Sequence, residues 1–297
     1  MGSSLFSAAL ERRDDSLSNA NTTPAESSHF QNALALGYNW VEGPHALQIN
    51  ARHDADSIFG TQNTGSLGYG LAIVDQWRAT VSFGTAFRVP TLYQRFSDYG
   101  SALLQPETSQ SFEASLRYAY DVADLGVSVY RNDVKNLIVY DGSVSVGTCV
   151  GADGSAWGGC YANVARARYE GVTISASRDF GMVQARLSLD FQNPQDLDSG
   201  KVLARRARQH GMVSLQTAWQ GWTVGTELHF SGMRYDDAEN TTELPEYALL
   251  NLYAQTQIGK DLSVLLRVDN AGDVPYVLAN GFATAGRTWY AGLKWAL

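Results

Sequence analysis

The chain has 297 residues, of which 18% are charged, and a formal net charge of −8 at pH 7. The negative charge and the lack of a basic patch count against a nucleic-acid partner. No apolar run reaches the roughly 18 residues of a membrane helix, so that class of membrane protein is excluded. The 15 Tyr, 11 Phe and 7 Trp beside only 7 Pro, with fewer charges than the usual quarter or so of a soluble surface, favour one large barrel over two soluble domains.

The first half of the chain alternates apolar and polar residues with a period of two, which is typical of strands with one apolar and one polar face. The segment DDSLSNANTTPAESSH (14–29) predicts a polar linker, and DSIFGTQNTG (56–65) predicts a loop. FRVPTLYQRFSDYGSALLQPETSQ (87–110) is far longer than a hairpin loop. The strands predicted in this half are residues 5–13, 34–40, 47–53, 67–73, 77–83 and 112–120.

The second half repeats the pattern, with short turns between pairs of strands and long polar loops after each pair. Its predicted strands are residues 125–140, 161–176, 183–191, 213–219, 222–230, 248–254, 262–268 and 289–297. The long loops are 193–208, 234–246 and 270–287. The whole chain therefore predicts an all-β fold of about 14 antiparallel strands without a substantial helix, which is the even number of an up-and-down barrel.

Two features favour a transmembrane β-barrel over a soluble sandwich, which also alternates. Long loops and short turns keep one phase, as outer-membrane barrels do, and aromatic residues gather at strand ends, as in the girdles at a bilayer surface. With the long loops outside the cell, the C-terminus lies on the periplasmic side and the apolar face contacts outer-membrane lipid. The opposite face then lines a wet lumen; its charged residues are Arg186, Asp190, Glu227, His229, Arg267 and Asp269.

The two cysteines, Cys149 and Cys160, lie in one glycine-rich segment, CVGADGSAWGGC. A disulfide that closes this loop is one interpretation if the loop is extracellular, and two unrelated free thiols are the other. The pair makes a poor zinc site without paired histidines nearby. We expect no metal, no cofactor and no catalytic residues, because the chain shows no Ser-His-Asp spacing and no phosphate loop; the sequence does not predict an enzyme.

Several segments resemble a known family. GTAFRVPTLYQRF followed by LQPETSQSFE, within residues 84–113, is similar to a signature of TonB-dependent outer-membrane receptors. YRNDVKNLI (130–138), NVARARYEGV (163–172), VDNAGDVPY (268–276) and TAGRTWYAGLKW (284–295) resemble later barrel strands of that family. Within it, YRNDVKNLI, LARRARQ (203–209) and GMRYDD (232–237) look most like the cobalamin (vitamin B12) transporters.

The resemblance implies an active importer of Gram-negative outer membranes, inserted by the barrel-assembly machinery. Its barrel has roughly 22 strands and an N-terminal plug, and TonB supplies the energy for uptake of cobalamin or a similar nutrient. It also implies that Arg205, with Arg206 and Tyr235 as further candidates, contacts the substrate, since the donor fork of arginine suits the amides and phosphate of a corrinoid. The alternative for Arg205 and Arg206 is that they are loop charges that serve solubility or contact lipopolysaccharide.

Residues 1–297 depart from the family pattern, because a plug, a TonB-contact segment, a signal peptide and about eight strands are not recognisable. We therefore expect the C-terminal portion of a receptor barrel, a fragment that does not perform energised transport alone. Two alternatives stay open: a siderophore receptor of the same superfamily, and a passive channel formed by a self-closed barrel of about 14 strands.

Overall fold

The structure is a computed structural model that describes residues 2–142, 149–151, 154 and 156–295. Its main feature is one antiparallel sheet of 14 strands in sequence order, in which each strand pairs with the next main strand along the chain. The strands of this sheet are β1 (Ser3–Ser18), β2 (Glu26–Glu42), β3 (His45–Asp56), β4 (Gly60–Val74), β5 (Trp77–Arg88), β6 (Glu107–Tyr120), β7 (Ala123–Asp141), β10 (Cys160–Asp179), β11 (Val183–Asp196), β12 (Gln209–Trp219), β13 (Trp222–Ser231), β16 (Tyr247–Ile258), β17 (Leu262–Asp269) and β18 (Thr288–Trp295). The predicted all-β, up-and-down architecture is confirmed.

Small elements decorate the loops. The helix α1 (Leu92–Phe96) lies between β5 and β6, and two short hairpins pair β8 (Cys149–Val150) with β9 (Ala156–Trp157) and β14 (Arg234–Tyr235) with β15 (Glu243–Leu244). In the part of the chain that the structure describes, no helix is long and apolar enough to cross a bilayer.

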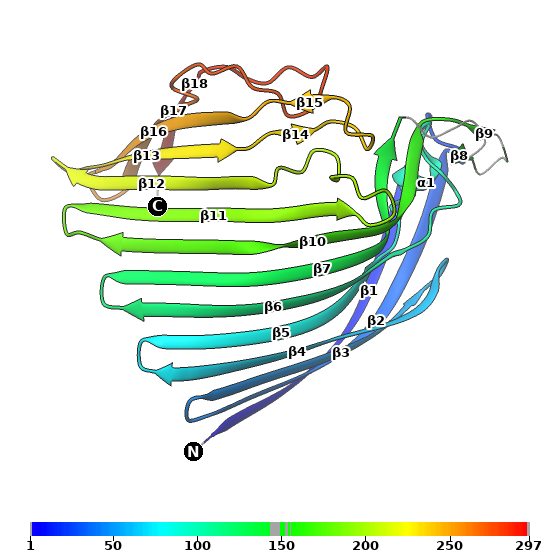
Figure 1. Cartoon of the computed structure of the whole chain (residues 1–297), viewed down its shortest axis with the longest axis horizontal. Coiled ribbons are helices and arrows are strands. Elements are labelled where there is room, and N and C mark those ends of the chain that lie inside the picture. The colour runs from blue at the N-terminus through cyan, green and yellow to red at the C-terminus, as the bar shows by residue number, and fades with distance from the viewer. Residues whose placement is uncertain (1, 143–148, 152–153, 155, 296–297) are drawn as a thin grey trace.

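The connections at the two ends of the sheet differ in length. Figure 1 shows tight turns and both chain termini at one end, and the long loops with α1, β8, β9, β14 and β15 at the other. We call these the turn end and the loop end. The phase of long and short connections is as predicted, with one exception between β3 and β4 described below.

The sheet curves strongly but does not close on itself (Figure 1). Within the described residues, β1 pairs only with β2 and β18 pairs only with β17, so both outermost strands keep one unpaired edge. In a bilayer core such edges leave backbone groups without partners at a cost of several kcal/mol each. A self-closed barrel of 14 strands is therefore not what this chain forms.

One face of the sheet is apolar, and the register carries it from strand to strand. Leu67 faces Phe83 across β4 and β5, and Phe83 faces Phe112 across β5 and β6. Phe83 is 48% exposed and Leu67 is 50% exposed, so these side chains are not packed in a dry interior. Broad exposure of aligned apolar side chains is what a lipid-facing surface requires. We call this surface the lipid face and the opposite one the lumen face.

Aromatic side chains gather on the lipid face at the turn end. Trp77 and Tyr118 pack with ring centroids 5.0 Å apart, and Trp219 lies opposite Trp222 in the β12–β13 register. Trp219 is 62% exposed. Rings with an apolar body and a polar atom favour the headgroup level of a bilayer, so this band marks one membrane surface.

The first hairpin corrects the sequence prediction. Residues 14–29 were expected as a polar linker, but β1 continues to Ser18 and β2 begins at Glu26. Ion pairs of Arg12 with Asp14 (2.8 Å) and Arg13 with Asp15 (2.9 Å) run along this strand extension. Both faces of this strand extension are polar. The alternation of apolar and polar residues that reveals a strand within the membrane is therefore absent in the extension.

The β3–β4 connection is the second correction. Residues 56–65 were expected as a loop, yet β3 ends at Asp56 and β4 begins at Gly60. Asp56 Oδ1 accepts the backbone N–H groups of Ile58 (2.8 Å) and Phe59 (3.0 Å), and Gly60 adopts φ +74°, which glycine tolerates without strain. These contacts make a tight turn where the sequence reads as a polar loop.

Glycine on the lumen face makes room for tyrosine. A Cβ at Gly225 would collide with the ring of Tyr253, whose hydroxyl donates to Gln216 Oε1 at 2.9 Å. We expect Gly225→Ala to lower the free energy of unfolding by about 1–3 kcal/mol through overpacking, and Tyr253→Ser in the same chain to relieve most of that loss. Urea unfolding of the chain in detergent measures it.

Gly68 in β4 provides the matched control, because its added Cβ meets only Gln48 Cβ at 3.9 Å. Gly68→Ala should change the free energy of unfolding by less than about 0.5 kcal/mol. Equal effects at Gly225 and Gly68 would show that the Tyr253 contact does not matter.

Candidate functional site

A cavity of about 450 Å³ opens at the loop end, between the ends of β7 and β10 and the loops 197–208 and 232–246. We call it the loop-end cavity. Its wall is apolar where strands provide it, and Leu203 from the first loop packs into a small core with Val134 and Ala167. Charged side chains come from the loops and from Asp196, the last residue of β11. Its lining includes Leu137, Val139, Tyr169, Asp196, Val202, Leu203, Arg205, Arg206, Asp236, Asp237 and Glu239.

The structure brings Arg205 and Arg206 to this cavity. Arg205 Nε donates to Asp236 Oδ1 at 2.7 Å, and its backbone N–H donates to Tyr235 O at 2.6 Å. Arg205 has φ +58°, a conformation that is uncommon for a residue with a side chain. Within the described residues, Arg206 makes no ion pair, and it is exposed.

Tyr235 lies beside the cavity through its backbone. It pairs with Glu243 in the β14–β15 hairpin, and its side chain is not among those that line the cavity. The carbonyl of Tyr235 fixes Arg205, so its position supports the arginine instead of presenting a phenol to a ligand.

Two neighbouring carboxylates at this site were not among the residues predicted from the sequence. Asp237 accepts the backbone N–H groups of Thr241 (3.0 Å) and Thr242 (2.6 Å), and these hydrogen bonds lower its pKa to about 2. The hydrogen bond from Arg205 lowers the pKa of Asp236 below its ordinary value. The signal in the sequence was the pair of aspartates followed by Thr-Thr, a pattern typical of a side-chain-capped turn.

The Asp237 turn should depend on pH. Because its pKa is lower in the folded loop than the ordinary 3.8, the stabilisation is complete above that value and is lost as the pH falls through about 2. We expect hydrogen-exchange protection of the Thr242 N–H, corrected for intrinsic rates, to persist at about pH 5 and to disappear between roughly pH 4 and 2. Asp237→Asn should lack this protection already at the higher pH. Protection that ignores both the pH and the substitution would contradict this assignment.

Three loops are joined at the site. Asp236 Oδ1 also accepts the backbone N–H of Asn280 at 3.2 Å, and buried Arg234 donates to the carbonyl of Val277. Asn240 Oδ1 accepts the N–H of Val202 at 2.9 Å. Hydrogen bonds therefore link the loops 197–208, 232–246 and 270–287 to one another around the cavity.

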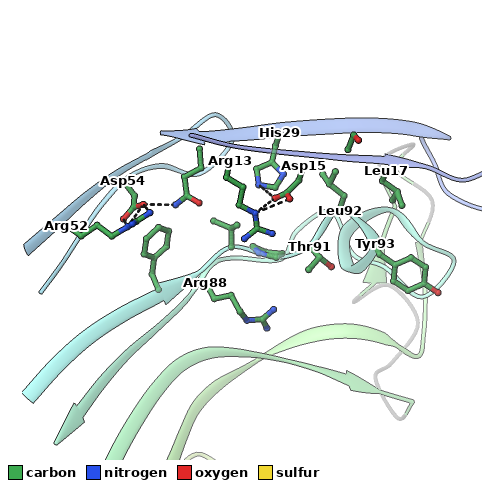
Figure 2. Close-up of a pocket in the computed structure, with 15 residues that line it drawn as sticks. Arg13, Asp15, Leu17, His29, Arg52, Asp54, Arg88, Thr91, Leu92 and Tyr93 are labelled. Atoms are coloured by element: carbon green, nitrogen blue, oxygen red, sulfur yellow. Dashed lines mark hydrogen bonds and ion pairs between the residues drawn. The ribbon is translucent and has the colours of Figure 1, made fainter. Parts of the chain in front are cut away.

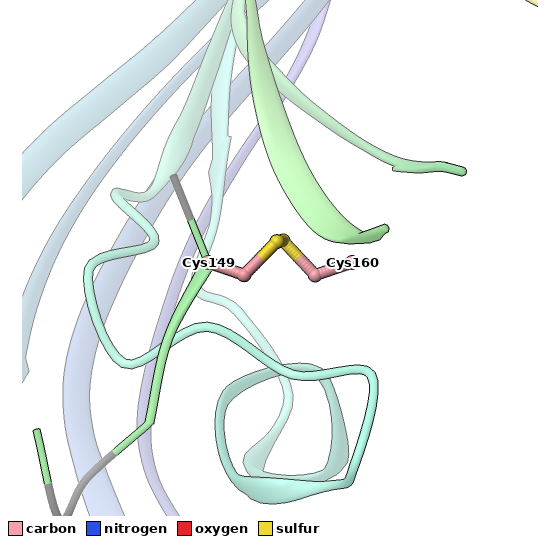
Figure 3. Close-up of a disulfide and its surroundings, with 2 residues drawn as sticks. All are labelled: Cys149 and Cys160. Carbon is pink, nitrogen blue, oxygen red and sulfur yellow. A yellow bond between two sulfur atoms is a disulfide. The ribbon is translucent and has the colours of Figure 1, made fainter. Parts of the chain in front are cut away.

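The predicted cysteine pair is joined in the structure. Figure 3 shows the disulfide between Cys149 and Cys160, with an S–S distance of 2.07 Å and both residues buried. The N–H of Tyr161, next to Cys160, donates to the carbonyl of Tyr99 at 2.8 Å, so the start of β10 is hydrogen-bonded to the loop between β5 and β6. Residues 143–148 between the strands lie outside the described part of the chain.

A second cavity, of about 480 Å³, lies on the lumen face between β1, β2 and β3 and the segment 87–93. Figure 2 shows Arg13 and Asp15 paired beside His29, and Arg52 paired with Asp54. The His29 side chain is only 4% exposed and its Nε2 is 3.5 Å from Asp15. Arg13 and Arg52 are paired with carboxylates of this wall, as in a structural network, whereas the buried Nδ1 of His29 has no hydrogen-bond partner among the described residues.

Charged residues that the sequence predicted on the lumen face are also paired or hydrogen-bonded with neighbouring side chains. Asp190 accepts hydrogen bonds from Tyr130 (3.0 Å) and Thr173 (2.6 Å), and Arg267 pairs with Asp269 at 3.1 Å. No group of three or more His, Cys, Asp or Glu that could hold a metal ion occurs among the described residues.

Comparison with known proteins identifies the family. A family model described as "TonB dependent receptor-like, beta-barrel" matches residues 6–271. The chain belongs to this family. The resemblance to TonB-dependent receptors noted in the sequence is thereby confirmed.

Curated relatives of this TonB-dependent receptor barrel are named vitamin B12 transporter BtuB. The protein of Photobacterium profundum is 27% identical over 286 residues, which are 95% of this chain and 46% of the relative. That of Vibrio vulnificus is 30% identical over 251 residues, which are 82% of this chain and 39% of the relative. The chain thus spans less than half the length of the curated relatives it matches.

Solved structures share the fold of this receptor barrel. A ferric enterobactin receptor mutant from Pseudomonas aeruginosa in complex with enterobactin superposes with a TM-score of 0.79 at 20% identity, over 99% of this chain and 52% of that chain. The siderophore receptor PirA from Acinetobacter baumannii gives 0.78 at 16% identity, over 98% of this chain and 52% of that chain.

Proposed function

We propose that residues 1–297 are the C-terminal barrel portion of an outer-membrane receptor that takes up cobalamin or a related large nutrient with energy from TonB. The observation that carries this proposal is the similarity to vitamin B12 transporters along 95% of the chain. The strands between the unpaired edges of β1 and β18, and the plug that contacts TonB, come from the remainder of the full receptor.

The loop-end cavity supports a role in capturing the ligand. Its apolar wall, with Leu137, Tyr169 and Leu203, suits the flat face of a macrocycle, and Arg206 offers guanidinium donors to amides or a phosphate. Arg205 holds Asp236 and so shapes the loop. The cavity lies at the loop end, which is the extracellular end of a multi-pass barrel in a Gram-negative outer membrane, inserted by the barrel-assembly machinery.

A siderophore receptor is the second candidate, favoured by the names of the structural neighbours. A passive channel of 14 strands is opposed by the unpaired edges of β1 and β18. The two receptor functions differ in the ligand that binds, and the channel differs from both in its conductance, so binding and conductance measurements distinguish them.

The test measures cyanocobalamin binding to the full 297-residue chain folded in detergent micelles, by quenching of tryptophan fluorescence. We expect saturable binding that Arg206→Ala weakens about 10- to 100-fold, since a hydrogen bond from a charged group contributes about 1.5–3 kcal/mol. Arg117→Ala, which breaks an exposed pair with Asp124 at the turn end, should leave binding unchanged. Steady conductance across a planar bilayer without corrinoid binding would replace this function by that of a channel.

A further inference from the structure

The loop-end cavity carries more negative than positive groups. Four carboxylates and two guanidinium groups line it, and the guanidinium groups are those of Arg205 and Arg206. The carboxylates are those of Asp196, Asp236, Asp237 and Glu239. Because backbone hydrogen bonds hold the pKa of Asp237 at about 2, this charge persists at any pH at which the loop is folded.

The positive groups are partly engaged already. Arg205 directs Nε to Asp236 Oδ1 at 2.7 Å and Nη2 to Asp236 Oδ2 at 3.4 Å, so both edges of that contact are used by a carboxylate of the protein. Asp236 in turn is fixed by the N–H of Asn280. Arg205 therefore cannot offer its Nε and Nη2 fork to an anionic ligand without giving up the contact that joins the loops, and only its outer N–H groups remain available.

In the part of the chain that the structure describes, Asp237 forms no ion pair. Its two carboxylate oxygens accept from Thr241 and Thr242, which are neutral donors. Glu239 pairs with Lys201 across the loops. Among the described residues that line the cavity, the charged groups without an ion pair are then the carboxylates of Asp196 and Asp237 and the guanidinium of Arg206. The mouth is thus net negative even after each ion pair is counted as neutral.

We propose that this cavity selects ligands without net negative charge, and that Asp196 and Asp237 are the residues that set this selection. The inference rests on the proposed function, because it concerns the ligand of the same site. It favours a neutral, amide-bearing macrocycle over a polyanionic iron chelate, since a ligand with several negative charges meets like charge at the rim and finds one unengaged guanidinium.

One test measures the sign of the potential without any nutrient ligand. Ala204 lines the cavity, and both native cysteines are joined in the disulfide, so Ala204→Cys introduces one reactive thiol. We expect a cationic trimethylammonium methanethiosulfonate reagent to react at least about fivefold faster than the sulfonate anion, after correction for their intrinsic rates. Raising the salt concentration should reduce the ratio. A ratio of one, or faster reaction of the anion, overturns the inference.

Neutralising substitutions locate the source of the potential. Adding Asp196→Asn and Asp237→Asn should bring the rate ratio close to one, and Glu239→Gln serves as a second variant that leaves the Asp237 turn intact and lowers the ratio less. The matched control is Asp124→Asn, whose carboxylate lies at the turn end beside Arg117. An unchanged ratio in the double variant, or an equal fall in the control, overturns the assignment to Asp196 and Asp237.

Ligand binding then separates this inference from the function it rests on. Wild-type chain should bind neutral cyanocobalamin more tightly than trianionic ferric enterobactin, and the double variant should gain at least about tenfold in ferric enterobactin affinity, as removal of like charge predicts. Equal affinity of wild-type chain for both overturns the inference. A cation-selective thiol reaction without cyanocobalamin binding would instead overturn the proposed function and leave the charge selection standing.

Discussion

Leu228→Arg is expected to make folding into a bilayer less favourable by about 2–4 kcal/mol, the cost of an arginine on the lipid face near the midplane. Leu228 is 40% exposed and lies between Val213 and Leu250 in the register of three neighbouring strands. Its surroundings on that face are apolar, so a guanidinium there has no partner. Denaturant titration of the chain folded into lipid vesicles measures the change.

The matched control uses the neighbouring register position on the other face. Ser214 lies opposite Glu227 across β12 and β13. Ser214→Arg places the same side chain in the wet lumen beside a carboxylate, where we expect a change below about 1 kcal/mol. If the two substitutions were equally costly, the division into a lipid face and a lumen face would be wrong.

Arg234→Ala is expected to loosen the loop end by about 2–4 kcal/mol, because it removes the shared donor of several buried carbonyls. Arg234 is 5% exposed, donates to the carbonyls of Gly232, Pro245 and Val277, and lies 5.0 Å from the ring centre of Tyr247. The expected result is faster hydrogen exchange and faster proteolysis in the loops 232–246 and 270–287, with the strand core unchanged.

Arg267→Ala is the comparison for this prediction. Arg267 also lies over a tyrosine, Tyr290, at 5.3 Å, but its side chain is 48% exposed and pairs with Asp269. An exposed pair contributes little, so the change should stay below about 1 kcal/mol. Loops that exchange at the same rate in both variants would show that Arg234 does not hold them.

The strands within the membrane were predictable because lipid on one side and water on the other impose the period of two. The alternation at Val183, Ala185, Leu187 and Leu189 marks β11, and the number of main strands agrees with the prediction. The hairpin register follows from the short turns.

The strand extensions at the loop end were not predictable in the same way. Water reaches both faces of β1 beyond Arg13, so polar residues there do not distinguish a strand from a linker. The helix α1 did have a signal, since Thr91 and Gln94 form a capping box, but five residues are too few for a helical apolar period.

The candidate site was predictable only through the resemblance. LARRARQ marked Arg205 and Arg206, which the fold places at one cavity, and GMRYDD marked the adjoining loop. The role of Asp236 as the partner of Arg205 depends on a contact between residues 31 positions apart, and no local pattern reports such a contact.

The unequal lengths of the strands affect how far the loop-end cavity stands from the bilayer. β10 has 20 residues and β7 has 19, whereas about 9–11 tilted residues cross a bilayer. The surplus, about ten residues at roughly 3.3 Å each and a tilt near 45°, raises that side of the wall by on the order of 20 Å. Leu137 and Tyr140 near the far end of β7 line the cavity, so the cavity stands well beyond the headgroups on the loop-end side of the bilayer.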